Sequence, residues 1–166
     1  MPVTRTVSVV NPLDDLYNLI EKGTIQKEIV IEKNGVRKTY TLRSLFDEDY
    51  NWRDRFVNMD SPVALGASLR SPTLAIATVA IDGVPVETIE DLSKIDDALP
   101  DVVKDAIAPD VKYIVAFNLH TKVYSKLPRD YITDLYSRYV SEVEAVARNV
   151  TREEIKNSSA STPSSV

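Results

Sequence analysis

A single histidine is the one imidazole that this chain could use for acid–base chemistry. His120 lies in the segment Asn118-Leu119-His120-Thr121, and none of the 166 residues is a cysteine. The lack of cysteine excludes disulfides, thiolate nucleophiles and iron–sulfur clusters, and a lone histidine excludes most imidazole-based metal sites. A small hydrolase using His120 with a serine or an aspartate is an alternative, but no Gly-x-Ser-x-Gly elbow or glycine-rich oxyanion loop accompanies it. We therefore expect His120 to be a half-buried structural residue.

A run of acidic residues begins in the way that a calcium-binding loop begins. Asp47, Asp49 and Asn51 supply oxygen atoms at the first, third and fifth positions. The sixth position, where the loop needs glycine, is Trp52, and the twelfth, where it needs a bidentate glutamate, is Asn58. The acids are better explained as the charged, solvated start of a helix, and no metal ion is predicted.

Phosphate and nucleic-acid chemistry are also disfavoured. The four glycines lie 12, 31 and 17 residues apart, so neither a Gly-x-Gly-x-x-Gly loop nor a Walker loop is present. With 20 Lys+Arg against 25 Asp+Glu the net charge is -5, which argues against binding to DNA, RNA or an anionic membrane. No cofactor is expected.

Length and hydropathy are typical of one soluble domain. The chain is 43% hydrophobic and 27% charged, which is enough apolar material for a real core. The most apolar window, residues 74–81, is far shorter than the roughly 20 residues needed to cross a bilayer. The N-terminus has no apolar run of signal-peptide length, so secretion through a signal peptide is not expected.

The first half of the chain predicts a helix, a hairpin and further helices. Residues 11–23 have helical capping signals, ending on Gly23, and Thr24 to Leu42 alternates with period two around Asn34-Gly35, the strongest short hairpin signal. A mixed helical pattern follows over 44–57. Two Ser-Pro pairs then frame helices at 62–70 and 72–81, although the second could be a buried strand.

The second half is predicted to be helical around one unresolved segment. Residues 61–110 hold nine acids against three bases, and short helices fit 88–98 and 101–107. Residues 111–127 fit a helix or a pair of strands. From Arg129 to Val150, apolar residues recur every three or four positions, as in a long amphipathic helix. We expect an N-terminal arm at 1–10, a single domain at 11–152 and a flexible Ser-rich tail at 153–166.

The long C-terminal helix is the one element where a functional interpretation competes with a structural one. Its apolar stripe could pack into the domain's own core, or it could dock a partner helix or a neighbouring subunit. The two interpretations can overlap. The candidate partner-binding residues are Tyr131, Leu135, Tyr139, Val143 and Trp52.

The order of elements resembles the small tail assembly chaperones and baseplate-hub proteins of tailed bacteriophages. The resemblance is carried by Leu42-Arg43-Ser44-Leu45 after the hairpin and by Ile81-Asp82-Gly83-Val84-Pro85-Val86 before the terminal helices. It covers roughly residues 25–146. It implies a protein without catalytic residues that either caps the hub in the virion or coats the hydrophobic helices of a tape-measure protein during assembly.

The sequence thus predicts an α+β fold, mostly helical, with one N-terminal β-hairpin and a long C-terminal amphipathic helix. The expected function is a non-enzymatic structural or assembly component of a phage tail or baseplate hub, part of an oligomeric assembly in the virion tail or the host cytoplasm. Its partners would be other tail or hub proteins, including a tape-measure protein. The alternatives are a tail assembly chaperone absent from the virion, a cellular protein-binding adaptor, and the small hydrolase using His120.

Overall fold

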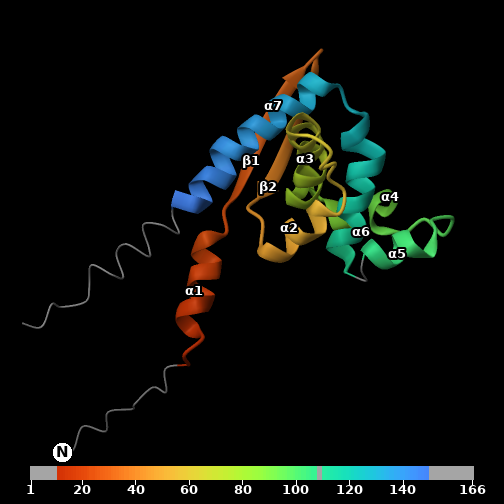
Figure 1. Ribbon diagram of the computed structural model, residues 1–166. Helices are drawn as coiled ribbons and strands as arrows, with labels where there is room; N and C mark the ends of the chain where they lie inside the picture. The colour runs from red at the N-terminus through yellow and green to blue at the C-terminus, as the bar shows by residue number, and fades with distance from the viewer. Residues whose placement is uncertain (1–10, 108–109, 150–166) are drawn as a thin grey trace, which may run out of the picture.

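The structure is a computed structural model, and it describes residues 11–107 and 110–149. A four-stranded antiparallel sheet formed by the first half of the chain lies against helices, most of which follow it in the sequence (Figure 1). The predicted α+β class with a mostly helical composition is confirmed. The expected arm at 1–10 and tail at 153–166 lie outside the described residues.

The predicted hairpin is formed by β1 (Gln26–Lys33) and β2 (Val36–Arg43), which pair antiparallel. Asn34 and Gly35 adopt φ angles of 53° and 78°, the positive values at both central positions that a type I′ turn requires. The alternation places Ile29 and Ile31 in the core. Both the turn and the buried face were predictable from the sequence, because a strand repeats every two residues.

A second tight turn extends the hairpin into a sheet. β3 (Thr78–Ile81) pairs with β2, and β4 (Val84–Pro85) pairs with β3, giving the strand order β1-β2-β3-β4. Asp82 and Gly83 again have positive φ angles, 51° and 76°. Only one hairpin was expected from the sequence, where residues 72–81 were assigned to a helix or a buried strand. β4 is too short to show any alternation of its own.

The prediction of two helices separated at Ser71-Pro72 is wrong, because α3 (Pro62–Ala77) runs through Pro72. Ser61 does cap this helix, since its hydroxyl accepts a hydrogen bond from Ala64 N–H at 3.1 Å. Pro72 removes one backbone hydrogen bond, but every residue from Pro72 to Ala77 is buried. Packing of this half of α3 outweighs the lost bond, and residues 72–81 divide into helix and strand at Thr78.

The helices that follow the sheet are short. One helix was expected over 88–98. After the 3-10 turn that ends at Thr88, only the four residues of α4 (Glu90–Ser93) are helical in this range. The segment 111–127, left open as helix or strands, is helical from Val111 to Lys126, and Asp110 caps its first turn by accepting a hydrogen bond from Lys112 N–H at 3.0 Å. The elements are η1 (Val86–Thr88), α4 (Glu90–Ser93), α5 (Asp101–Ile107), α6 (Val111–Asn118), the π turn η2 (Leu119–Val123) and the 3-10 turn η3 (Tyr124–Lys126).

The predicted long helix is α7 (Arg129–Tyr139), which continues through the π turn η4 (Val140–Glu144) and remains helical to residue 149. It runs alongside β1 at the edge of the sheet (Figure 1). The Arg138 guanidinium donates a hydrogen bond to the carbonyl of Val30 in β1, and Glu142 pairs with Lys27 at 3.3 Å. These contacts cover an edge that would otherwise expose backbone groups.

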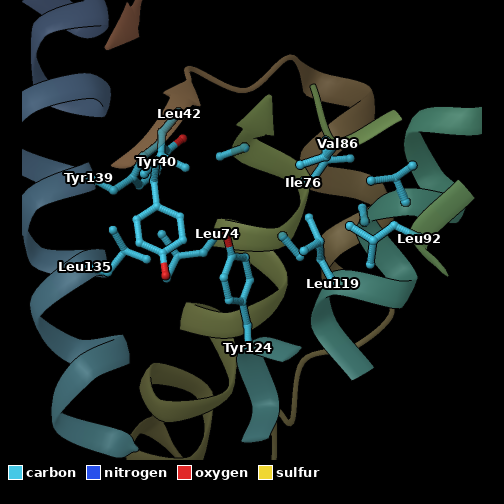
Figure 2. Packing of buried hydrophobic residues seen from close by; sticks show 14 of the residues in the cluster. Tyr40, Leu42, Leu74, Ile76, Val86, Leu92, Leu119, Tyr124, Leu135 and Tyr139 are labelled. Carbon is cyan, nitrogen blue, oxygen red and sulfur yellow. The ribbon is translucent and has the colours of Figure 1, made fainter. Parts of the chain in front are cut away.

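The core lies between the sheet, α3, α6 and α7. Figure 2 shows Leu135 and Tyr139 of α7 beside Tyr40 of β2, with Leu74 and Tyr124 at the centre. The cluster continues through Leu119, Ile76 and Val86 to Leu92 on the far side. One cluster therefore joins the N-terminal sheet to the C-terminal helices.

Candidate protein-binding surface

Helix α1 (Asp14–Gly23) leads away from the body of the protein and joins it only through the start of β1 (Figure 1). Its root is fixed, because Ile25 exchanges two hydrogen bonds with Ser44. The Ile25 N–H donates to the Ser44 hydroxyl at 2.9 Å, and the Ser44 N–H donates to the Ile25 carbonyl at 2.8 Å. The chain is therefore fixed to the sheet two residues after the end of the helix.

One face of helix α1 is apolar and uncovered. The side chains of Leu13, Leu16, Tyr17 and Ile20 are 46%, 54%, 58% and 54% exposed. Their spacing of three, one and three residues places them on one side of a helix. A contiguous stripe of large apolar side chains that nothing in the described chain covers is typical of a surface that binds another protein.

The residues proposed from the sequence for partner binding lie elsewhere. Leu135, Tyr139 and Val143 are completely buried, and Trp52, which is 2% exposed, stacks its ring on that of Tyr113 at 5.8 Å. These four side chains fill the protein's own core and form no exposed docking stripe. Of the two interpretations of the α7 stripe, the structure favours packing in the domain's core.

Tyr131 is the member of that set that reaches a surface hollow. It is half-buried, its hydroxyl lies 2.7 Å from that of Tyr40, and it lines a groove of about 460 Å³ at the tip of the β1–β2 hairpin. Lys33 and Lys38 at the rim are ion-paired with Asp130 and Asp82. The apolar lining consists of Val36, Tyr40, Ile81, Val123, Tyr124, Leu127, Pro128 and Tyr131.

The hydroxyl of Tyr139 is buried without a hydrogen-bond partner among the described residues. Burial raises the pKa of this phenol. Tyr139→Phe removes an unsatisfied polar group, so we expect the free energy of unfolding to increase by about 1 kcal/mol in urea titrations. Tyr124→Phe is the matched control, because the Tyr124 hydroxyl lies 2.7 Å from that of Thr78, and its loss should decrease stability by about 1 kcal/mol. A loss with both variants would contradict the assignment.

The acidic run at the start of α2 (Asp47–Asp54) is only partly the solvated helix start that was expected. Asp49 is completely buried and forms a 2.8 Å ion pair with Arg43. It also accepts a hydrogen bond from Phe46 N–H at 3.0 Å and lies 3.3 Å from Lys112. Burial alone would raise the pKa of this carboxyl, but the Arg43 and Phe46 hydrogen bonds and the two cations outweigh burial and lower it. The site is an internal ion-pair network that joins β2, α2 and α6.

Comparisons with known proteins supply no family for the chain. No family model matches it, and neither curated proteins nor solved structures give a significant match. Across the described residues, no helix has the length and apolar character required to cross a bilayer, and no three acidic or histidine side chains are grouped so as to hold a metal ion. The function is therefore inferred from the surface of the protein itself.

His120 lies in the π turn η2, where its Nδ1 atom is hydrogen-bonded to the Ser71 hydroxyl at 2.6 Å. Burial lowers the pKa of the imidazole, which favours its neutral form. In the described chain, no carboxylate forms a hydrogen bond with the ring to orient it as in a catalytic triad. Among the described residues, the Ser71–His120 pair therefore lacks the carboxylate that completes a catalytic triad.

Proposed function

We propose that the protein is a non-enzymatic structural or assembly component of a bacteriophage tail or baseplate hub, and that it binds other tail proteins through the apolar face of α1. The observation that carries this proposal is the stripe of Leu13, Leu16, Tyr17 and Ile20, which is about half exposed along its length. The resemblance of residues 42–45 and 81–86 to tail assembly and hub proteins supplies the kind of partner.

The energetics of the stripe suit a partner that covers it. Complete burial of one large apolar side chain contributes about 1.5–3 kcal/mol, so covering the exposed half of four such side chains contributes about 3–6 kcal/mol before the costs of association. This amount favours binding as one element of a larger interface. An amphipathic helix presented in this way is a common means of docking into an apolar groove or against another helix.

The groove lined by Tyr131 favours the second candidate function, a tail assembly chaperone that is absent from the virion. Its apolar lining and paired rim charges are compatible with a hydrophobic helix of a tape-measure protein. A lysine that is already neutralised by an aspartate can be covered without leaving a lone buried charge. In this role, α1 and the groove would both contact the client helix.

The test is the double substitution Leu16→Glu and Ile20→Glu. We expect wild-type protein co-expressed with the tail proteins of its own virus to elute as a complex well above 18.6 kDa, and the double variant to elute alone. Because both side chains are already exposed, the melting temperature should change little. Size-exclusion chromatography with light scattering measures the native mass.

The double substitution Val63→Glu and Val102→Glu is the matched control, because both side chains are exposed, one on α3 and one on α5, and the two changes add the same charge. A double variant that still forms the complex, or a control that loses it equally, would contradict a role for α1. Mass spectrometry of purified virions separates the two candidate functions, since a structural subunit is retained in the particle and a chaperone is not. Binding only to non-viral proteins would favour a cellular adaptor.

A further inference from the structure

A second hollow lies where α3, η2, η3 and the start of α7 meet. It has a volume of about 370 Å³, and its apolar surface includes the Phe56 and Tyr124 rings and the side chain of Ile132. Serines, arginines and His120 make up the polar part of the lining, and none of the described residues that line the hollow is an aspartate or glutamate. The groove at the hairpin tip, by contrast, has Asp130 in its lining.

Two arginines, Arg70 and Arg129, line this hollow. Arg70 Nη1 donates a hydrogen bond to the Thr133 hydroxyl at 3.0 Å, which holds the Arg70 guanidinium against the first turns of α7, where Arg129 is the first residue. Neither forms an ion pair with a carboxylate of residues 11–107 or 110–149. Lys33 and Lys38, at the rim of the other groove, are both neutralised.

Neutral hydrogen-bonding groups also line this hollow. The Ser71 hydroxyl and His120 Nδ1 are bonded to each other, and the His120 ring lies 5.8 Å from that of Phe56. The hydroxyls of Ser68 and Ser125 come from residues that also line the hollow. These two hydroxyls already donate to backbone carbonyls three and four residues earlier in the chain. The guanidinium groups, which have no ion-pair partner among the described residues, are therefore the donors left for a ligand. Beside an aromatic surface, they suit a ligand with a charged head and an apolar body.

We propose that this hollow binds a small molecule that joins an oxyanion, a phosphate or a carboxylate, to an aromatic or other apolar body. Arg70 and Arg129 bind the oxyanion, because guanidinium groups form charge-assisted bonds with planar or tetrahedral oxyanions. Phe56 and Ile132 contact the body, and the volume lies within the range of small-molecule sites. The proposal is independent of the α1 surface, which belongs to another part of the molecule.

The test uses His120 as a reporter, because the only histidine gives one unambiguous imidazole C2 proton signal in NMR. The full chain is titrated at constant ionic strength with phenyl phosphate, benzoate, phenol and inorganic phosphate. We expect saturable shifts of this signal with phenyl phosphate or benzoate, at concentrations at least tenfold below those needed for inorganic phosphate or phenol. The stronger of the two aromatic anions identifies the preferred head group.

Arg70→Gln and Arg129→Gln should each weaken binding of that anion at least tenfold. Arg37→Gln is the matched control, because it removes the same charge from an exposed position of β2 outside the hollow and should leave binding unchanged. Arg129 is exposed, so its variant tests the site even if Arg70→Gln reduces stability. The absence of a saturable shift with both aromatic anions, equal binding of phenol, or an equal effect of Arg37→Gln would overturn the proposal.

Discussion

Replacing Asp49 by alanine should decrease the free energy of unfolding by about 3–5 kcal/mol, because it leaves a buried cation without its partner. Arg43, whose side chain is largely buried, loses its 2.8 Å ion pair, and the Phe46 N–H loses its acceptor. Urea titration followed by circular dichroism measures the loss. Asp47→Ala is the control: this residue is exposed in the same helical turn, so its replacement should change stability by no more than about 0.5 kcal/mol.

The same carboxyl predicts the direction of a pH effect. The pKa of Asp49 is lower in the folded protein than its ordinary value of about 3.9, so the folded state favours the ionised form. The contribution to stability is complete above about pH 4 and is lost as the pH decreases through the lower, folded-state pKa. Wild-type protein should therefore lose stability more steeply than Asp49→Asn in acid. Parallel acid titrations of the two proteins would contradict this assignment.

Leu135→Ala should decrease the free energy of unfolding by about 2–5 kcal/mol. Leu135 is completely buried between α7 and the rest of the core (Figure 2), and the surrounding side chains can only partly fill the resulting cavity. The matched control is Leu16→Ala in α1, which removes the same atoms from an exposed stripe. It should change stability by about 0.5 kcal/mol or less while weakening association with a partner.

Together, the two leucine variants decide which helix is the interface. If Leu135 were at a partner-binding surface, its replacement would weaken binding and leave the isolated chain stable. Because Leu135 is buried and Leu16 is exposed, we predict that Leu135→Ala lowers the stability of the isolated chain and that Leu16→Ala weakens binding. Thermal unfolding of the isolated chain, measured beside the native mass of the complex, separates these outcomes.

Local patterns were sufficient to predict much of the fold. The Asn34-Gly35 turn followed from the need for positive φ angles, and the apolar period located the C-terminal helical segment that begins with α7. The path of α3 through Pro72 could not be predicted in the same way, because the compensating contacts come from residues distant in sequence. The burial of Asp49 depends likewise on Lys112, which is 63 residues away in the chain.

The candidate surface was less predictable than the elements that form it. Periodicity shows which side chains share a face of a helix, but it does not show whether the same chain covers that face. The stripes of α1 and α7 have similar spacing, yet Leu16 is exposed and Leu135 is buried. The hollow with Arg70 and Arg129 is assembled from three separate segments, and no short motif brings these residues together.

The two borders of the sheet limit how copies of this protein can associate. At one border, the Arg138 guanidinium donates a hydrogen bond to the Val30 carbonyl of β1. At the other, β4 has two residues, and one of them is Pro85, which has no N–H group. A neighbouring chain that added a strand would therefore have to displace Arg138 at one border or pair with a two-residue strand at the other. Both borders therefore disfavour association of copies through backbone pairing, and leave contacts between side chains as the favoured mode.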